Sequence, residues 1–173
     1  MRSDVTLIGV GNPWRCDDGV GWAVAAAARR RLGDGIAVIE TDGEPSRLID
    51  AWTDTGLAVV VDAMNSGADP GTIRVCRGDA EFVQGRKANA SHSLGLAEAI
   101  ALGRAVQRLP QDLVVVGIEV QQTSHGNELS AAVSAAVERA AEVIGGLVNE
   151  WRQSDLRQAG SNATSSAAPG SSE

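Results

Sequence analysis

The segment GVGNPWRCDDGVG, residues 9–21, decides how this chain is interpreted. It follows a short apolar run at residues 5–10 and precedes an alanine-rich stretch with helical spacing. A glycine-rich loop between a strand and a helix usually binds phosphate at the helix N-terminus. In this chain two adjacent aspartates, Asp17 and Asp18, stand where the helix should begin. The loop therefore has the shape of a phosphate site and the charge of a cation site.

The nucleotide interpretation is the weaker of the two. The dinucleotide fingerprint Gly-x-Gly-x-x-Gly fits the first two glycines, but Trp14 stands at the third glycine position. A phosphate placed at this helix start would meet the carboxylates of Asp17 and Asp18. Acidic residues near the end of the second predicted strand, Glu40 and Asp42, could imitate a ribose contact. A nucleotide-binding α/β protein therefore stays as an alternative.

The composition is that of an ordinary soluble domain. The chain has 173 residues, of which 43% are hydrophobic and 21% are charged, close to the averages for globular proteins. Its net charge of −7 argues against a general nucleic-acid binder, which needs a basic face. It has two cysteines without a Cys-x-x-Cys pair, and we expect neither a secretory leader nor a membrane span. We expect a cytoplasmic protein, monomeric and without membrane or nucleic-acid partners.

Strand-like and helix-like segments alternate along the chain. The predicted strands are residues 5–10, 36–40, 57–62, 71–76 and 113–118, and the predicted helices are residues 19–32, 45–52, 91–106 and 130–151. This alternation predicts an α/β fold with a mostly parallel sheet covered on both faces. The loop between the third and fourth strands is too short for a parallel crossover. We therefore expect that pair to be antiparallel, the sheet to be mixed and the fourth strand to lie at an edge.

The end of the chain has a different composition. Residues 154–173, SDLRQAGSNATSSAAPGSSE, are rich in Ser, Ala and Gly and contain almost no large apolar side chain. Such a segment cannot bury enough surface to offset the entropy lost on ordering. We predict one folded domain over residues 1–152 and a disordered tail over residues 153–173.

Three polar residues far apart in the sequence are candidates for one site. Asp18 follows the first strand, Asp62 ends the third, and His92 lies at the start of a predicted helix. We expect the first and third strands to be neighbours in this topology. Because loops at the carboxyl ends of neighbouring parallel strands meet in one crevice, we expect these side chains to converge. Two carboxylates and an imidazole suit a divalent first-row metal ion with open positions for water or substrate. The set suits hydrolysis, in which a carboxylate or the ion activates water.

Each candidate also has a purely structural interpretation. An aspartate at a helix start can act as a cap, Asp62 can terminate a strand, and His92 can be a solvated residue. His125, in the polar loop after the fifth strand, fits an exposed position better than the site. Cys16 lies beside an aspartate that opposes thiolate formation, so it is not assigned as a nucleophile. An exposed Trp near a site often contacts a protein partner, which makes Trp14 notable.

Four segments together resemble the hydrogenase maturation endopeptidases. They are GVGNPWRCDDGVG after the first strand, VVVDAMNSGADPGTI at the third, SHSLGLAEAI at a helix start, and GIE followed by G-x-x-L-S-x-x-V. The resemblance covers about residues 4–148 in the expected order and spacing. It implies a three-layer α/β/α sandwich with a twisted, mostly parallel, mixed five-stranded sheet.

The resemblance also implies a function. Members of this family remove a short C-terminal extension from the large-subunit precursor of a nickel–iron hydrogenase after nickel has been inserted. The family's metal-contacting positions fall on Asp18, Asp62 and His92, and those of an aspartic-type catalytic pair on Asp18 and Asp62. The nickel would be carried by the substrate precursor. A non-proteolytic, nickel-sensing chaperone for the precursor is the second alternative.

The chain departs from the family pattern after its second strand. The family tends to carry Asp-Gly-Gly-Thr there, whereas this chain has TDGEPSRL, with Glu44 and Pro45 in place of the Gly-Thr pair. No substrate-binding role is therefore carried over to that loop beyond Gly43. Pro13 and Trp14 also alter the tip of the first loop.

Overall fold

A five-stranded sheet forms the middle of the molecule. The computed structural model describes residues 4–78 and 91–165, with side chains for all of these except 91–94 and 159–165. The strands are β1 (Val5–Val10), β2 (Ala37–Thr41), β3 (Leu57–Met64), β4 (Ile73–Arg77) and β5 (Asp112–Glu119). The helices are α1 (Val20–Leu32), α2 (Pro45–Trp52), α4 (Ser91–Ala105) and α5 (Ala131–Ser165), with short 3-10 turns η1 (Cys16–Gly19) and η2 (Gly33–Gly35).

The sheet is mixed, as predicted, but one strand pairing differs from the prediction. The strand order is β2-β1-β3-β5-β4, and β1, β2, β3 and β5 run parallel. The edge strand β4 pairs antiparallel with β5. The prediction that the third and fourth strands pair with each other is therefore wrong, because β5 lies between them. The loop after β3 passes the end of β5, which occupies the buried position beside β3.

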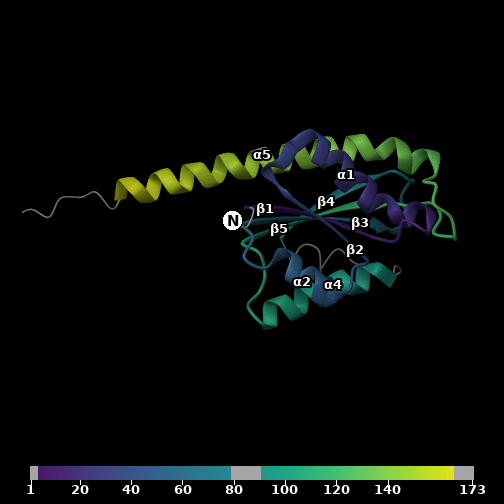
Figure 1. Ribbon diagram of the computed structural model, residues 1–173, viewed down its shortest axis with the longest axis horizontal. Helices are drawn as coiled ribbons and strands as arrows, with labels where there is room; N and C mark the ends of the chain where they lie inside the picture. The colour runs from purple at the N-terminus through teal and green to yellow at the C-terminus, as the bar shows by residue number, and fades with distance from the viewer. Residues whose placement is uncertain (1–3, 79–90, 166–173) are drawn as a thin grey trace, which may run out of the picture.

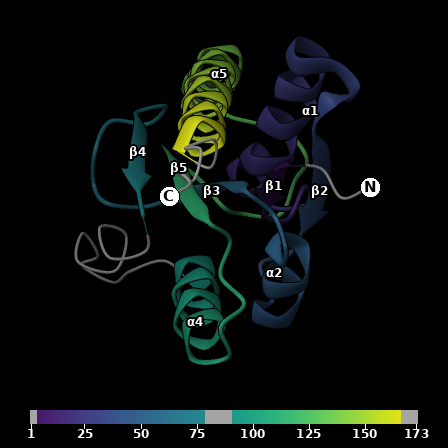
Figure 2. The ribbon, with the colours of Figure 1, turned by 90° about the vertical axis from the view of Figure 1, so that its left-hand side faces the viewer.

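Helices cover both faces of the sheet and make it a three-layer α/β/α sandwich, as predicted. Figure 2 shows α1 and α5 on one face and α2 and α4 on the other. Alternate residues of β3 divide accordingly. Val59 and Val61 belong to the core under α1 and α5, whereas Ala58 and Val60 belong to the core under α2 and α4. This alternation fixes the face to which the next residue, Asp62, is directed.

Helix α5 is longer than the sequence predicts. Its packed part ends near Trp151, but the helix continues to Ser165 and projects beyond the sheet (Figure 1). The side chains of residues 153–158 are exposed. Propagating an existing helix requires no new nucleation, so these mostly polar residues can stay helical without a core contact. The helix therefore includes residues for which we predicted disorder, while the domain boundary near residue 152 stays a prediction.

The N-terminal ends of α1, α4 and α5 lie at the same end of the sheet, where the parallel strands finish (Figure 1). This end carries the loops after β1, β3 and β5, and is where the candidate site residues were expected. Among the helices of the described ranges, none combines the length and the apolar character needed to cross a membrane.

Candidate active site

The first loop brings Asp18 into the interior at the carboxyl end of β1. Asp18 lies in η1, is only 2% exposed, and its Oδ2 accepts a hydrogen bond from the backbone N–H of Asn12 at 3.1 Å. Gly11 permits this path, because its φ is +141° and a Cβ there would lie 1.9 Å from the backbone oxygen of Asp18. Gly11 therefore helps to position Asp18, because the absence of a side chain lets the two backbone segments come into contact.

The start of α1 lies directly on the ends of two strands. A Cβ on Gly21 would approach the carbonyl oxygens of Val10 in β1 and Val61 in β3 to 2.1 Å and 2.7 Å. Only a residue without a side chain allows this approach. The turn η1, which carries Asp18, also contacts β3.

Asp62 lies at the same end of the sheet. It follows Val61, whose register partner in β1 is Gly9, and it faces Gly117 of β5. It is 4% exposed, and by alternation with Val60 its side chain is directed toward the layer that contains α4. Its Oδ1 atom is buried without a hydrogen-bond donor among the described residues, although the carboxylate makes another interaction. Two buried acids therefore lie at the carboxyl ends of β1 and β3.

His92 lies in the first turn of α4, but its side chain is outside the described residues. The described side chains include no group of three or more His, Cys, Asp or Glu that could hold a metal ion. The proposed set of Asp18, Asp62 and His92 therefore stays a prediction.

Asp17, the neighbour of Asp18, has a different role from the one expected. We interpreted the two aspartates together as directed at a cation, but Asp17 is fully buried against the loop between β5 and α5. Its carboxylate accepts hydrogen bonds from the backbone N–H groups of Gln121, Gln122 and Ser130 and from the Ser130 hydroxyl, at 2.6–3.1 Å. Asp17 thus ties the first loop to the start of α5.

The protonation of Asp17 follows from these contacts. Burial alone raises the pKa of its carboxyl, but the hydrogen bonds from Ser130, Gln121 and Gln122 outweigh burial and leave that pKa below its usual value of 3.8. Asp17 is therefore ionised, and its charge lies at the N-terminus of α5, where the helix dipole favours an anion. No local pattern reveals this role, because Asp17 and Ser130 are 113 positions apart.

Cys16 and His125 lie in different surroundings. Cys16 is buried, has a left-handed φ of 47° and places its Sγ 3.9 Å from the Ser124 hydroxyl. His125 is exposed in the loop that ends at α5, as the sequence suggested. Residues of this type seldom adopt positive φ, so the surrounding contacts hold Cys16 in a strained conformation directly before the two aspartates.

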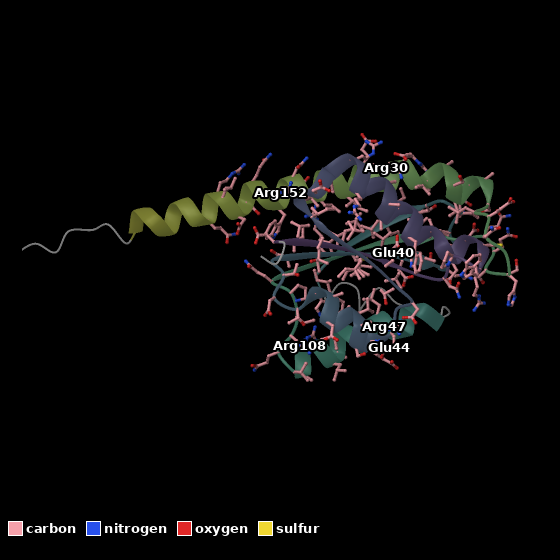
Figure 3. The ribbon with its side chains drawn as sticks, viewed as in Figure 1. Arg30, Glu40, Glu44, Arg47, Arg108 and Arg152 are labelled. Atoms are coloured by element: carbon pink, nitrogen blue, oxygen red, sulfur yellow. The ribbon has the colours of Figure 1, made fainter. Side chains whose placement is uncertain are left out.

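The loop that departs from the family pattern has its own structure. Glu44 caps α2 by accepting hydrogen bonds from the N–H groups of Ser46 and Arg47, and Pro45 occupies the first turn of the helix. Asp42 pairs with the Arg47 guanidinium at 3.2 Å, and Glu44 and Arg47 lie close together at the start of α2 (Figure 3). The hydrogen bond from the Glu44 amide, with Arg47 nearby, holds the pKa of Asp42 below its usual value. Glu44 and Pro45, which stand in place of the family's Gly-Thr pair, thus cap the start of α2.

Comparison with known proteins gives a consistent result. The family model described as hydrogenase maturation protease matches residues 24–146, more than half of the chain. The chain is 28% identical to the hydrogenase expression/formation protein HoxM of Cupriavidus necator over 152 residues, which cover 85% of this chain and 75% of HoxM.

Two solved structures share the fold. The hydrogenase maturating endopeptidase HybD from Escherichia coli superposes with a TM-score of 0.76 at 23% identity, over 87% of this chain and 93% of that one. The nickel–iron hydrogenase maturation protease HybD from Thermococcus kodakarensis has a TM-score of 0.65 at 28% identity, over 85% of this chain and 99% of that one.

Proposed function

Since this chain belongs to the hydrogenase maturation protease family, we propose that it removes the C-terminal extension from the nickel-loaded large-subunit precursor of a nickel–iron hydrogenase. The observation that carries the proposal is the placement of two buried acids, Asp18 and Asp62, at one end of the sheet within this family's fold. The matched segment contains Asp62 and His92 and begins after Asp18. The assignment of Asp18 to the site therefore rests on the motif of the first loop and on the position of Asp18 in the structure.

The proposed cation is nickel that arrives with the precursor. Carboxylate oxygens and a neutral imidazole are ligands that first-row divalent ions accept. In the proposal, Asp18, Asp62 and His92 contact the ion while it is still held by the precursor. The neutral imidazole is the form that binds metal, and His92 lies in the first turn of α4.

The reaction is hydrolysis of one peptide bond. The oxygen of a water molecule bonds to the scissile carbonyl carbon, the carbon–nitrogen bond breaks, and the departing amine takes up a proton. Two routes fit the proposed residues. In the first, Asp18 or Asp62 accepts a proton from the attacking water and passes it to the departing amine, as in an aspartic-type protease. In the second, nickel held by Asp18, Asp62 and His92 would supply Lewis acidity to the carbonyl oxygen, and the proton of the attacking water would pass to the departing amine.

Dependence on a substrate-borne ion would give the enzyme its selectivity. A protease that is complete without its substrate can cleave many proteins, whereas this site gains its ion only when loaded precursor binds. The precursor without nickel would therefore be spared. We include in the proposal a monomeric enzyme located in the cytoplasm.

The alternatives are less well supported. A nucleotide-binding protein needs a free helix start at the first loop, but Asp17 and Asp18 occupy that position and Trp14 replaces the third glycine. A chaperone on this fold would bind the precursor without cutting it. Incubating the protein with its cognate precursor, with and without nickel, and measuring intact masses separates the protease from the chaperone. A mass loss at the precursor's C-terminus supports the protease, and binding without mass loss refutes it.

A further inference from the structure

Trp14 differs from the other tryptophans of the chain in its exposure. Its side chain is 71% exposed, whereas Trp52 is fully buried and Trp22 and Trp151 are half-buried. Burying an aromatic side chain such as an indole removes about 150–250 Å² of surface from water. Trp is one of the residue types that are enriched at the energetic centres of protein interfaces. Single exposed apolar side chains are common, so exposure alone does not indicate a binding role for Trp14. The structure of the surrounding loop is the further observation that does.

The loop that carries Trp14 is held firmly. The backbone N–H of Trp14 donates to Asn12 Oδ1 at 2.9 Å, and its carbonyl accepts from the N–H of Gly126 at 3.0 Å. Next to it, the N–H of Cys16 donates to the carbonyl of Gly126 at 2.8 Å, and Arg15 and Gly126 form a parallel β-bridge. Arg15 Nε donates to the carbonyl of Thr123 at 3.2 Å. A residue held in this way loses little backbone freedom when a partner binds it.

The same hydrogen bonds connect Trp14 to the candidate site. Asn12 accepts from the N–H of Trp14 through its side chain and donates to Asp18 Oδ2 through its own N–H. The backbone that carries the exposed indole is therefore held relative to a carboxylate of the site through one intermediate residue, Asn12. A partner that binds at Trp14 is therefore positioned relative to Asp18.

The surroundings of Trp14 fit a protein partner. Arg15 and residues 121–128 of the adjoining loop are exposed, and these are mostly polar. An aromatic anchor beside a polar, solvated rim is the usual composition of a protein–protein interface.

We propose that Trp14 is a docking anchor for the large-subunit precursor, and that its indole enters an apolar pocket on the folded precursor beside the C-terminal extension. The inference rests on the proposed function, because it takes the substrate of that function as the partner. It assigns to the first loop a second task. Asp18 would face the ion, while Trp14, four positions earlier, would hold the protein that carries it.

The test compares Trp14→Ala with a matched control. Leu156 on the projecting part of α5 is 72% exposed, nearly the same fraction as Trp14, so Leu156→Ala removes an equally exposed apolar side chain away from the loop. With nickel-loaded precursor we expect Trp14→Ala to raise KM about 10- to 30-fold with kcat nearly unchanged, as for an interface anchor. We expect Leu156→Ala to match the wild type and Trp14→Phe, which keeps an aromatic ring, to lie between.

Three kinetic results would overturn the docking role. An unchanged KM in Trp14→Ala would show that the indole does not hold the precursor. A fall in kcat with an unchanged KM would place Trp14 in the chemical step instead. An equal rise of KM in Leu156→Ala would also contradict it, because the effect would then not be specific to this loop.

A binding measurement keeps this inference distinct from the proposed function. The affinity for the precursor is measured for Asp62→Asn alone and for Asp62→Asn combined with Trp14→Ala, where no cleavage is expected. A loss of affinity of about tenfold or more on removing Trp14 supports docking even if the wild type never cleaves, in which case only the protease proposal fails. Equal affinity of the two variants refutes docking whether or not the wild type is active.

Discussion

The carboxylate of Asp17 accepts two hydrogen bonds from Ser130, one from its backbone N–H at 2.6 Å and one from its hydroxyl at 2.9 Å. This contact joins the turn before α1 to the start of α5. The two adjacent aspartates therefore have different roles. Asp17 holds the first loop against the start of α5, whereas Asp18 lies at the carboxyl end of the sheet.

Replacing Asp17 should therefore destabilise the protein. In Asp17→Ala the N–H groups of Gln121, Gln122 and Ser130 lose a charged acceptor, and a buried polar group without its partner costs about 1–3 kcal/mol. We expect the free energy of unfolding to fall by about 2–4 kcal/mol in urea denaturation. Asp50→Asn, which removes only an exposed ion pair with Arg108, should lower it by less than about 1 kcal/mol. Equal effects would contradict the role of Asp17.

The same carboxylate should contribute to the pH dependence of stability. Its folded-state pKa lies below the unfolded value of 3.8, so the unfolded chain binds the proton more tightly. The stabilisation is therefore complete above pH 3.8 and is lost as the pH falls through the folded-state pKa. The difference in unfolding free energy between the wild type and Asp17→Asn should therefore shrink as the pH is lowered from about 6 to about 3, a range that includes the unfolded-state pKa. A constant difference would show that the pKa of Asp17 is the same in the folded and unfolded states.

The candidate site residues should be needed for processing and dispensable for folding. We expect Asp62→Asn, Asp18→Asn and His92→Ala each to lower the rate of precursor cleavage by about 100-fold or more. Far-UV circular dichroism should stay that of the wild type. The exposed variant Asp50→Asn serves as the control for activity. Wild-type cleavage by Asp62→Asn or His92→Ala would remove that residue from the site.

Gly11 should be irreplaceable, because an added Cβ would lie 1.9 Å from the backbone oxygen of Asp18 and its φ is +141°. We expect Gly11→Ala to lose processing and to destabilise the fold by more than about 1 kcal/mol. Gly145 in α5 is the matched control, since a Cβ there meets nothing within 4 Å. Gly145→Ala should stabilise the protein by about 0.5–1 kcal/mol with full activity. A Gly11→Ala variant as stable and active as the wild type would show that the loop has another path.

Local patterns explain why much of the fold could be predicted from the sequence. The bounds of β1 and α2 match the predicted ones, because a buried apolar run and a proline at a helix start are visible within a few residues. The neighbouring positions of β1 and β3 followed from the usual topology of α/β sheets.

Long-range contacts explain the errors. Whether β4 pairs with β3 or β5 depends on which edge is open after the sheet assembles, and no nearby residue reports it. The pairing of Asp17 with Ser130 is likewise invisible in the sequence, so two adjacent acids with different partners were interpreted alike. The length of α5 was underestimated because polar residues can extend a helix that is already anchored by its packed part.

The most direct test of the proposed nickel-dependent cleavage is the intact mass of the cognate large-subunit precursor after incubation with the protein. We predict that nickel-loaded precursor loses its C-terminal extension, that nickel-free precursor keeps it, and that Asp62→Asn leaves both uncut. Equal cleavage of loaded and nickel-free precursor by the wild type would contradict the account.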